Sequence, residues 1–180
     1  MMTAITSSAT AGPVCLVTAL AQEHAVVRKS IGDDTTHLVA AGFIAAEELS
    51  HSQPALAGLV SIGFCGGLSP DLRSGAIVVP RRIITPDTEE SFSADPDWHA
   101  RVAAQLAALK PETEAALYSA NDMLETPAAK RDVHERCHAR AVDMESAGIA
   151  HAAQRLRVPF LAIRIVLDEA ADTLPRAAAN

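Results

Sequence analysis

Short apolar runs alternate with longer amphipathic segments along most of this chain. Within each run the apolar residues are consecutive instead of alternating with polar ones, which is typical of strands covered on both faces. The runs therefore predict strands in the core of a layered fold. They lie at Val14–Leu20, Leu59–Gly63, Ala76–Pro80, Ala115–Tyr118, Ala141–Met144 and Phe160–Leu167.

Helical patterns occupy the intervals between these runs. The clearest covers Pro96–Lys110, where Asp95 is placed to cap the first turn and Trp98, Val102 and Leu106 recur on one face. By contrast, residues 84–97 (ITPDTEESFSADPD) have the composition of an exposed loop. The remaining helices are predicted at Gln22–Ile31, Phe43–His51, Pro127–His138 and Glu145–Leu156.

The order of strand, helix and strand predicts an α/β fold, a three-layer αβα sandwich whose central sheet is mostly parallel or mixed. At 180 residues the chain fits one domain, and 49% hydrophobic residues suffice for a large core. We expect residues 14–180 to form this domain. Residues 1–13 carry no Lys or Arg, which favours a disordered tail over a signal peptide.

Composition narrows the range of partners. The net charge is -7 without a basic run, which argues against a nucleic-acid partner. No apolar run is long enough to span a bilayer. The cysteines Cys15, Cys65 and Cys137 are odd in number and far apart, which favours a reducing compartment, and we expect a cytoplasmic protein.

Carboxylates follow three of the predicted strands: Glu23, Glu145 and Asp168. Ligands of open α/β sheets bind beyond the carboxyl ends of parallel strands, so these side chains and the glycine-rich turn at 64–68 (FCGGL) would share one edge. Each carboxylate also has a structural interpretation, as a helix cap or a favourable charge in a first turn. Together they could stabilise a cationic transition state and move protons, as cleavage of a glycosidic bond requires.

Three stretches resemble the purine nucleoside phosphorylase and methylthioadenosine/adenosylhomocysteine nucleosidase superfamily. They are residues 17–23 (VTALAQE), 60–80 (VSIGFCGGLSPDLRSGAIVVP) and 141–172 (AVDMESAGIAHAAQRLRVPFLAIRIVLDEAAD). The motif VDMES followed by R-x-x-x-D is the most specific part of the resemblance, which covers most of the chain. VSIGFCGGL and DEAADTLP are most similar to the hopanoid-associated phosphorylases, a branch held to remove adenine from an adenosylhopane precursor. The resemblance implies the phosphorylase/hydrolase-like fold.

The resemblance also implies roles for matching residues. Glu145 would hold the ribose 2′- and 3′-hydroxyls, with Met144 packed beneath the sugar, and its charge would stabilise a cationic ribosyl ring. Asp168 would protonate or hydrogen-bond N7 of the departing purine, and Glu23 would activate the attacking water. The remaining residues expected to bind substrate are Met123 and Leu124 at the base, and Phe64, Cys65 and Gly66 at the glycine-rich turn.

Some positions depart from the family pattern. Phe64 stands where the phosphorylases place a phosphate-binding hydroxyl, and Ser61 stands where some carry an arginine. Burying phosphate without these groups would be costly, which favours hydrolysis over phosphorolysis. Leu167 replaces the serine that often precedes the acid. The sequence also ends soon after Asp168, before the C-terminal helix that the family implies.

The segment 134–138 (HERCH) fits the zinc motif H-E-x-x-H. A catalytic zinc helix lies buried beside a cleft, whereas residues 130–140 (KRDVHERCHAR) are polar on nearly every face. This composition predicts a surface helix without a metal. Cys65 lacks a neighbouring histidine in sequence, so we interpret it as a packed residue and not as a nucleophile.

We therefore predict an enzyme that cleaves the N-glycosidic bond of a purine nucleoside, with adenine as the expected base and adenosylhopane as a candidate substrate. No cofactor is expected, and phosphate is the one candidate co-substrate. A phosphate-dependent phosphorylase, a nucleoside-binding domain without turnover and a zinc hydrolase remain as alternatives. We expect a homo-oligomer, since superfamily members commonly build their pockets at subunit contacts.

Overall fold

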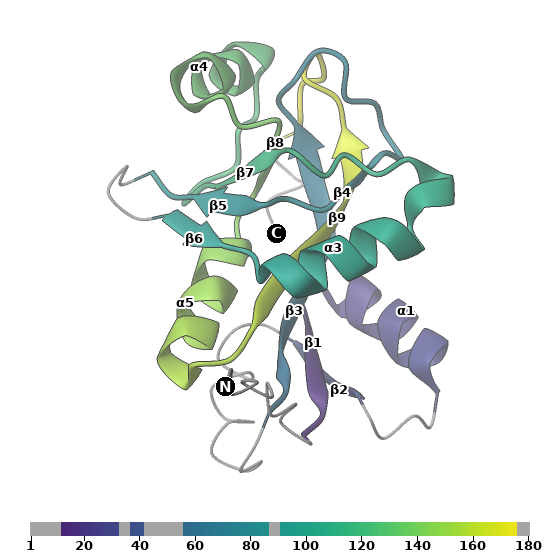
Figure 1. The fold of residues 1–180 in the computed structure, drawn as a ribbon. Coiled ribbons are helices and arrows are strands. Elements are labelled where there is room, and N and C mark those ends of the chain that lie inside the picture. Colours follow the sequence, from purple (N-terminus) through teal and green to yellow (C-terminus); the bar gives the residue numbers. More distant parts are fainter. Residues whose placement is uncertain (1–11, 33–36, 42–55, 87–90, 176–180) are drawn as a thin grey trace, which may run out of the picture.

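The computed structural model describes residues 12–32, 37–41, 56–86 and 91–175, in which helices lie on both faces of one mixed sheet (Figure 1). The strands are β1 (Val14–Thr18), β2 (His37–Ala41), β3 (Gly58–Gly67), β4 (Ile77–Val78), β5 (Arg82–Ile84), β6 (Ser91–Ser93), β7 (Ala116–Ser119), β8 (Ala141–Asp143) and β9 (Phe160–Asp168). The helices are α1 (Ala21–Ile31), α3 (Pro96–Gln105), α4 (Pro127–Cys137) and α5 (Ser146–Leu156), with a 3₁₀ turn at Ala107–Leu109. The predicted helix Phe43–His51 and residues 1–11 of the predicted tail lie outside the described residues.

Strand β3 is the centre of the sheet. On one edge it pairs in parallel with β9 from Leu59 to Gly66. On the other edge it pairs in parallel with β1 as far as Ser61, and then antiparallel with β8 at Gly66 and Gly67. The sheet continues from β8 through β7 and β5 to β6, while β2 lies beside β1 and β4 beside β9. The predicted α/β class with a mixed sheet is confirmed.

Alternate residues of the central strands pack against different helices. Phe160 and Ala162 of β9 belong to the apolar cluster that contains the buried face of α5. Leu161 and Ile163, on the opposite face of the same strand, belong to the cluster that contains Trp98 of α3. Because side chains of a strand alternate between faces, α5 and α3 cover opposite sides of the sheet. The continuous apolarity of this strand follows from that double covering.

The local signals that predicted the helices are present in the structure. Asp95 accepts a hydrogen bond from the Trp98 amide at the start of α3, and Thr126 accepts one from the Ala129 amide at the start of α4. Each of these helices has proline in its first turn, as the missing amide proton allows. Helix α3 ends at Gln105, earlier than predicted, and the chain continues in the 3₁₀ turn.

The prediction of an exposed loop at residues 84–97 was wrong in part. Ile84 ends β5, and residues 91–93 form β6, which pairs antiparallel with β5 at the edge of the sheet. Short edge strands of this kind expose alternate residues and so have nearly the composition of a loop. Ser91 and Ser93 are exposed, and Phe92 alone turns inward to pack against the core.

Candidate active site

The central strand has an interruption in its pairing at the place where the carboxylates gather. On one edge of β3, pairing with β1 ends at Ser61 and pairing with β8 begins at Gly66. Since β1 runs parallel to β3 and β8 runs antiparallel to it, the carboxyl ends of β1 and β8 point toward each other across this gap. The segments that carry Glu23 and Glu145 follow these two strand ends directly.

This arrangement corrects the expectation that the carboxylates follow strands running in one direction. Strand β8 is antiparallel to β3 and parallel to β7. The carboxylates converge because two strands of opposite direction end on the same short stretch of β3.

Glu23 fills the gap in the pairing of β3. Its Oε1 accepts a hydrogen bond of 2.8 Å from the Phe64 amide, which no strand partner satisfies. Its Oε2 accepts bonds of 3.0 and 2.9 Å from the amides of Ala19 and Leu20, at the start of α1. Glu23 is buried, and Gly63 leaves room for it, since a Cβ at that position would lie 2.6 Å from Oε1. A side chain at position 63 would overlap the Glu23 carboxylate, so glycine is required there for Glu23 to reach β3.

Glu145 stands at the N-cap position of α5, on the opposite side of the gap. Its Oε2 accepts a long hydrogen bond of 3.3 Å from the Met144 amide, and within the described part of the chain the carboxylate accepts no other. Burial raises the pKa of Glu145, and the neighbouring Asp143 carboxylate raises it further. The Glu145 carboxyl is thus desolvated but free to receive hydroxyl groups of a ligand, while the Met144 side chain beside it is 48% exposed.

Asp168 ends β9 and lies against Gly66 of β3. A Cβ on Gly66 would lie 3.0 and 3.3 Å from the two carboxylate oxygens of Asp168. The Oδ2 atom accepts a bond of 2.5 Å from the Nζ atom of Lys130, a residue of α4. The Oδ1 atom makes no hydrogen bond within the described ranges. The sequence did not reveal Lys130, which lies on a helix whose composition is that of a surface element.

A cavity of about 160 Å³ joins Glu145 and Asp168. Its wall comes from the ends of β3, β8 and β9, from the start of α4 and from the loop that precedes α4. Glu23 does not line it, but its carboxylate lies next to it at the gap in β3, where it accepts a hydrogen bond from the amide of the lining residue Phe64. The apolar lining residues are Phe64, Cys65, Met123, Leu124, Val142, Met144, Leu167 and Leu174, and the others are Gly66, Asp122, Lys130, Asp143, Glu145 and Asp168.

A buried arginine supports the floor of this cavity. The guanidinium of Arg164, in the middle of β9, donates a hydrogen bond of 2.8 Å from Nε to Asp143 Oδ2, and one of its terminal nitrogens lies 2.7 Å from the same oxygen in an ion pair. The same terminal nitrogen donates to the hydroxyls of Ser61 (2.6 Å) and Ser146 (2.9 Å). Asp143 in turn accepts the Ser146 amide at the start of α5. The network connects β3, β9, β8 and α5, the elements that position Glu145.

Ser61 and Cys65, in and just before the glycine-rich turn, have surroundings in the structure that the sequence did not predict. Ser61 is fully buried as a partner of Arg164 and does not line the cavity. Cys65 lines the cavity, but burial raises the pKa of its thiol to about 12. A thiol in this state is protonated at neutral pH and is a poor nucleophile.

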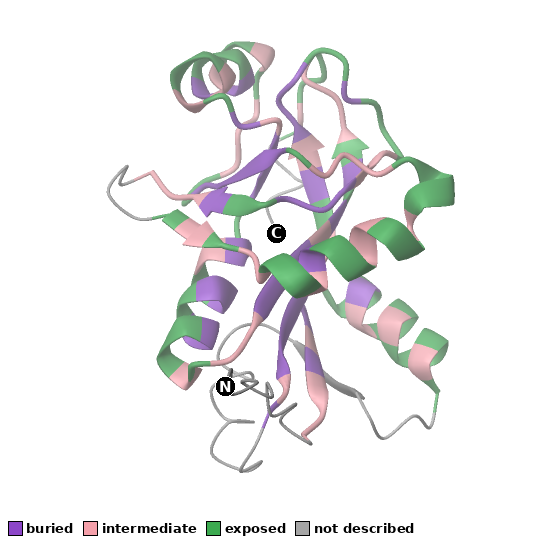
Figure 2. Cartoon of the chain, in the orientation of Figure 1, coloured by how far each residue is buried: buried purple, intermediate pink, exposed green. Residues whose placement is uncertain are grey.

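The zinc motif does not lie on one helical face. Helix α4 ends at Cys137, and His138 beyond it has a left-handed backbone with a φ of 56°. His134 uses its Nδ1 to contact the Ala139 carbonyl oxygen at 2.7 Å. The part of the chain that the structure describes contains no group of three His, Cys, Asp or Glu residues suited to a metal. Helix α4 is largely exposed, although Lys130 and Val133 are buried (Figure 2).

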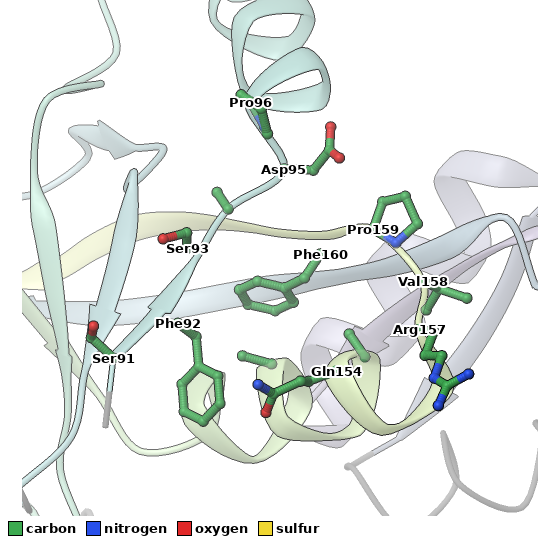
Figure 3. Close-up of a pocket in the computed structure, with 13 residues that line it drawn as sticks. Ser91, Phe92, Ser93, Asp95, Pro96, Gln154, Arg157, Val158, Pro159 and Phe160 are labelled. Carbon is green, nitrogen blue, oxygen red and sulfur yellow. The ribbon is translucent and has the colours of Figure 1, made fainter. Parts of the chain in front are cut away.

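A second hollow, of about 500 Å³, lies between β6, the start of α3 and the turn from α5 to β9 (Figure 3). It contains Phe92 and Phe160, with Gln154 and Arg157 on the helical side. Among the described residues that line it, the one carboxylate is Asp95, which caps α3. The acidic side chains of the described residues gather instead in the cavity of Glu145 and Asp168, and we place the candidate active site in that cavity.

The sequence matches the phosphorylase superfamily over residues 4–179. The chain belongs to this superfamily. The match covers nearly the whole chain, including every element around the cavity, and confirms the prediction of an enzyme of this superfamily. It also includes β1, β8 and β9, at or after whose carboxyl ends the three carboxylates lie.

Solved structures of nucleosidases have the same fold. A methylthioadenosine nucleosidase of Helicobacter pylori, a D198N mutant holding 5′-methylthioadenosine, gives a TM-score of 0.76 at 14% identity over 89% of this chain and 87% of that one. The 5′-methylthioadenosine/S-adenosylhomocysteine nucleosidase of Neisseria meningitidis, in complex with methylthio-immucillin-A, gives 0.76 at 18% identity, covering 88% and 87%. Futalosine hydrolase of Helicobacter pylori gives 0.73 at 14% identity, covering 87% and 88%. The superfamily members thus share an architecture with this chain at low sequence identity.

The described helices include none that is both long and apolar enough to cross a bilayer.

Proposed function

We propose that this protein hydrolyses the N-glycosidic bond of a purine nucleoside and releases the free base. The observation that carries the proposal is the single cavity that Glu145 and Asp168 line from opposite elements, with Met144 beside Glu145. The similar folds of methylthioadenosine nucleosidases and futalosine hydrolase support the same class of reaction.

The residues would divide the reaction as follows. Glu145, with no strong partner of its own, binds the ribose hydroxyls and stabilises positive charge that develops on the sugar. Asp168, carrying a proton on its unpaired Oδ1, donates it to N7 of the leaving purine, which then departs as a neutral base, and the proton that the attacking water loses restores the acid. Glu23 activates water at C1′ while its carboxylate is held by backbone amides at the gap in β3.

The lining of the cavity favours water over phosphate as the attacking group. Of the described residues that line it, Lys130 is the one cation, and its three protons are already donated to protein oxygens. Phe64 occupies the place where a phosphate-binding hydroxyl was expected and is 39% exposed at the cavity. A phosphate dianion would therefore meet carboxylates and an aromatic ring without a free cation to bind it.

The rim of the cavity supports adenosylhopane, or a nucleoside with a similarly large apolar 5′ substituent, as the substrate. Leu167 is 62% exposed and Met144 is 48% exposed, and both line the cavity together with Phe64. Exposed apolar side chains around a pocket are typical of a surface that receives an apolar ligand. We propose adenine as the base.

Release of free base tests this function. The purified protein is incubated with adenosine, inosine, methylthioadenosine and an adenosine that carries a bulky apolar 5′ substituent, each with and without phosphate, and products are separated by chromatography. We expect phosphate-independent release, fastest from the apolar adenosine derivative. Release that requires phosphate would identify a phosphorylase. Tight binding without release would identify a binding protein, and either result would refute hydrolysis.

A further inference from the structure

Lys130 is a buried cation on a largely exposed helix. Its side chain is 1% exposed, whereas Ala128, Arg131 and Asp132 of the same helix are exposed. A buried ammonium is costly unless its charge and all of its protons have partners. The contacts of Lys130 therefore indicate what this position is for.

The Nζ atom of Lys130 has three acceptors. It bonds Asp168 Oδ2 at 2.5 Å, the Glu169 carbonyl oxygen at 2.7 Å and the Asp172 carbonyl oxygen at 3.0 Å. An ammonium group has three protons to donate, so none is left for a ligand. The turn at residues 169–172 thus wraps around the ammonium, and the Leu174 amide continues this attachment by donating to the Glu125 carbonyl oxygen at 2.8 Å.

No other hydrogen bond in the described part of the chain holds the Asp168 carboxylate. The preceding residue, Leu167, is 62% exposed and offers no polar side chain to orient it. Gly66 limits its position on one side by contact, and Lys130 fixes Oδ2 on the other. As a result, Oδ1 is the oxygen that remains for a ligand in the cavity.

We propose that Lys130 is a positioning residue for Asp168: by holding Oδ2 and the turn at 169–172, it presents Oδ1 to the leaving base. This inference rests on the proposed function. Loss of the ammonium leaves the carboxylate free to rotate, and the contact with the base becomes irregular. Misplacement of such a group by about 1 Å costs on the order of 10²-fold in rate.

If the role of Lys130 were purely structural, its loss would slow the reaction equally for all leaving groups. Two substrates whose leaving groups differ in their need for a proton therefore distinguish the two roles. When C1′–N9 of an adenine nucleoside breaks, the base takes the electron pair and leaves neutral because Asp168 Oδ1 gives its proton to N7; the proton lost by the attacking water later restores the Asp168 acid. When C1′–O of 4-nitrophenyl β-D-ribofuranoside breaks, nitrophenolate takes the electron pair and leaves as a stable anion without a proton. In both reactions water supplies the hydroxyl that joins C1′ and loses one proton.

The test compares Lys130→Met with wild type on both substrates. The matched control is Arg131→Met, which removes an exposed cation from the next position of α4. We expect Lys130→Met to lower kcat for the adenine nucleoside by about 10²-fold with KM little changed, and to lower kcat for the nitrophenyl riboside less than about tenfold. Arg131→Met should match wild type on both.

Equal losses of kcat on the two substrates would overturn the assignment of Lys130 and indicate a structural role. No base release by wild type itself would overturn the proposed function, and the positioning role with it. If Lys130→Met shows no cooperative melting, Lys130→Gln replaces it, because its amide still donates to the carbonyl oxygens of the turn. The same difference between the substrates is then required.

Discussion

The buried pair of Arg164 and Asp143 predicts a large effect of a single substitution. In Arg164→Met, the methionine side chain takes the place of the apolar part of the arginine, but the guanidinium is lost. Asp143 therefore keeps its charge and loses both contacts with the guanidinium, of 2.7 and 2.8 Å. Ser61 and Ser146 lose a donor at the same time. Removing one partner of such a pair typically costs about 3–5 kcal/mol, because an uncompensated buried charge remains.

This cost is a substantial part of the stability expected for a domain. Native domains unfold with about 5–15 kcal/mol, and each kcal/mol shifts the Tm of a chain of this size by about 2–4 °C. We therefore expect Arg164→Met to lower the Tm by about 6–20 °C in thermal denaturation followed by circular dichroism. Base release should also fall, since Asp143 is the last residue of β8, the strand that leads to Glu145.

A double-mutant cycle distinguishes lost pairing from lost packing. The variant Arg164→Met/Asp143→Leu removes both charges, and an apolar pair of similar size can replace a buried ion pair at little cost. We expect the double variant to be more stable than Arg164→Met alone. Arg81→Met, which breaks an exposed pair with Glu114, serves as control and should melt close to wild type. Equal melting of Arg164→Met and Arg81→Met would refute the reasoning.

Two further substitutions test the carboxylates on either side of the gap in β3. Gly63→Ala should slow base release by about 10²-fold, because its Cβ would lie 2.6 Å from Glu23 Oε1 and displace that carboxylate. The control is Gly148→Ala, on an exposed face of α5. A Gly63→Ala variant with the activity of wild type would contradict the role of Glu23. Glu145→Gln should abolish release yet raise the Tm. Burial raises the pKa of Glu145 above its ordinary value of 4.5, so wild type loses stability as the pH rises from that ordinary value through the raised pKa, and the Tm advantage of Gln should grow over the same rise in pH. A constant Tm difference over this range would show that Glu145 is not desolvated.

The sequence predicted the parts of the fold that depend on local patterns. Continuous apolarity identified β1, β3 and β9, because these strands are covered on both faces, and proline with a capping side chain marked the start of α3 and α4. The edge strand β6 was missed since its residues 91–93 are mostly exposed. The pairing of β6 with β5 depends on tertiary contacts, and a short polar segment has no local pattern that predicts them.

The candidate site was predictable in its residue types but not in its geometry. The positions of Glu23, Glu145 and Asp168 after strands suggested one edge of a sheet, yet the carboxylates meet because β8 is antiparallel to β3. The burial of Lys130 could not be predicted from the sequence of its polar helix, because it depends on contacts with the turn at residues 169–172. A local sequence pattern predicts which face of a helix or strand is buried, whereas these contacts join residues that are far apart in sequence.

The distribution of charge around the cavity bears on the choice between water and phosphate. The two cations beside it, Lys130 and Arg164, are each paired with a carboxylate and have further protein acceptors. An additional anion near the unpaired Glu145 carboxylate would cost about 4 kcal/mol per pair of unit charges at 4 Å with an effective dielectric constant near 20. That energy corresponds to a loss of nearly 10³ in affinity. Water carries no such cost, so a cavity whose cations are already committed to Asp168 and Asp143 favours hydrolysis.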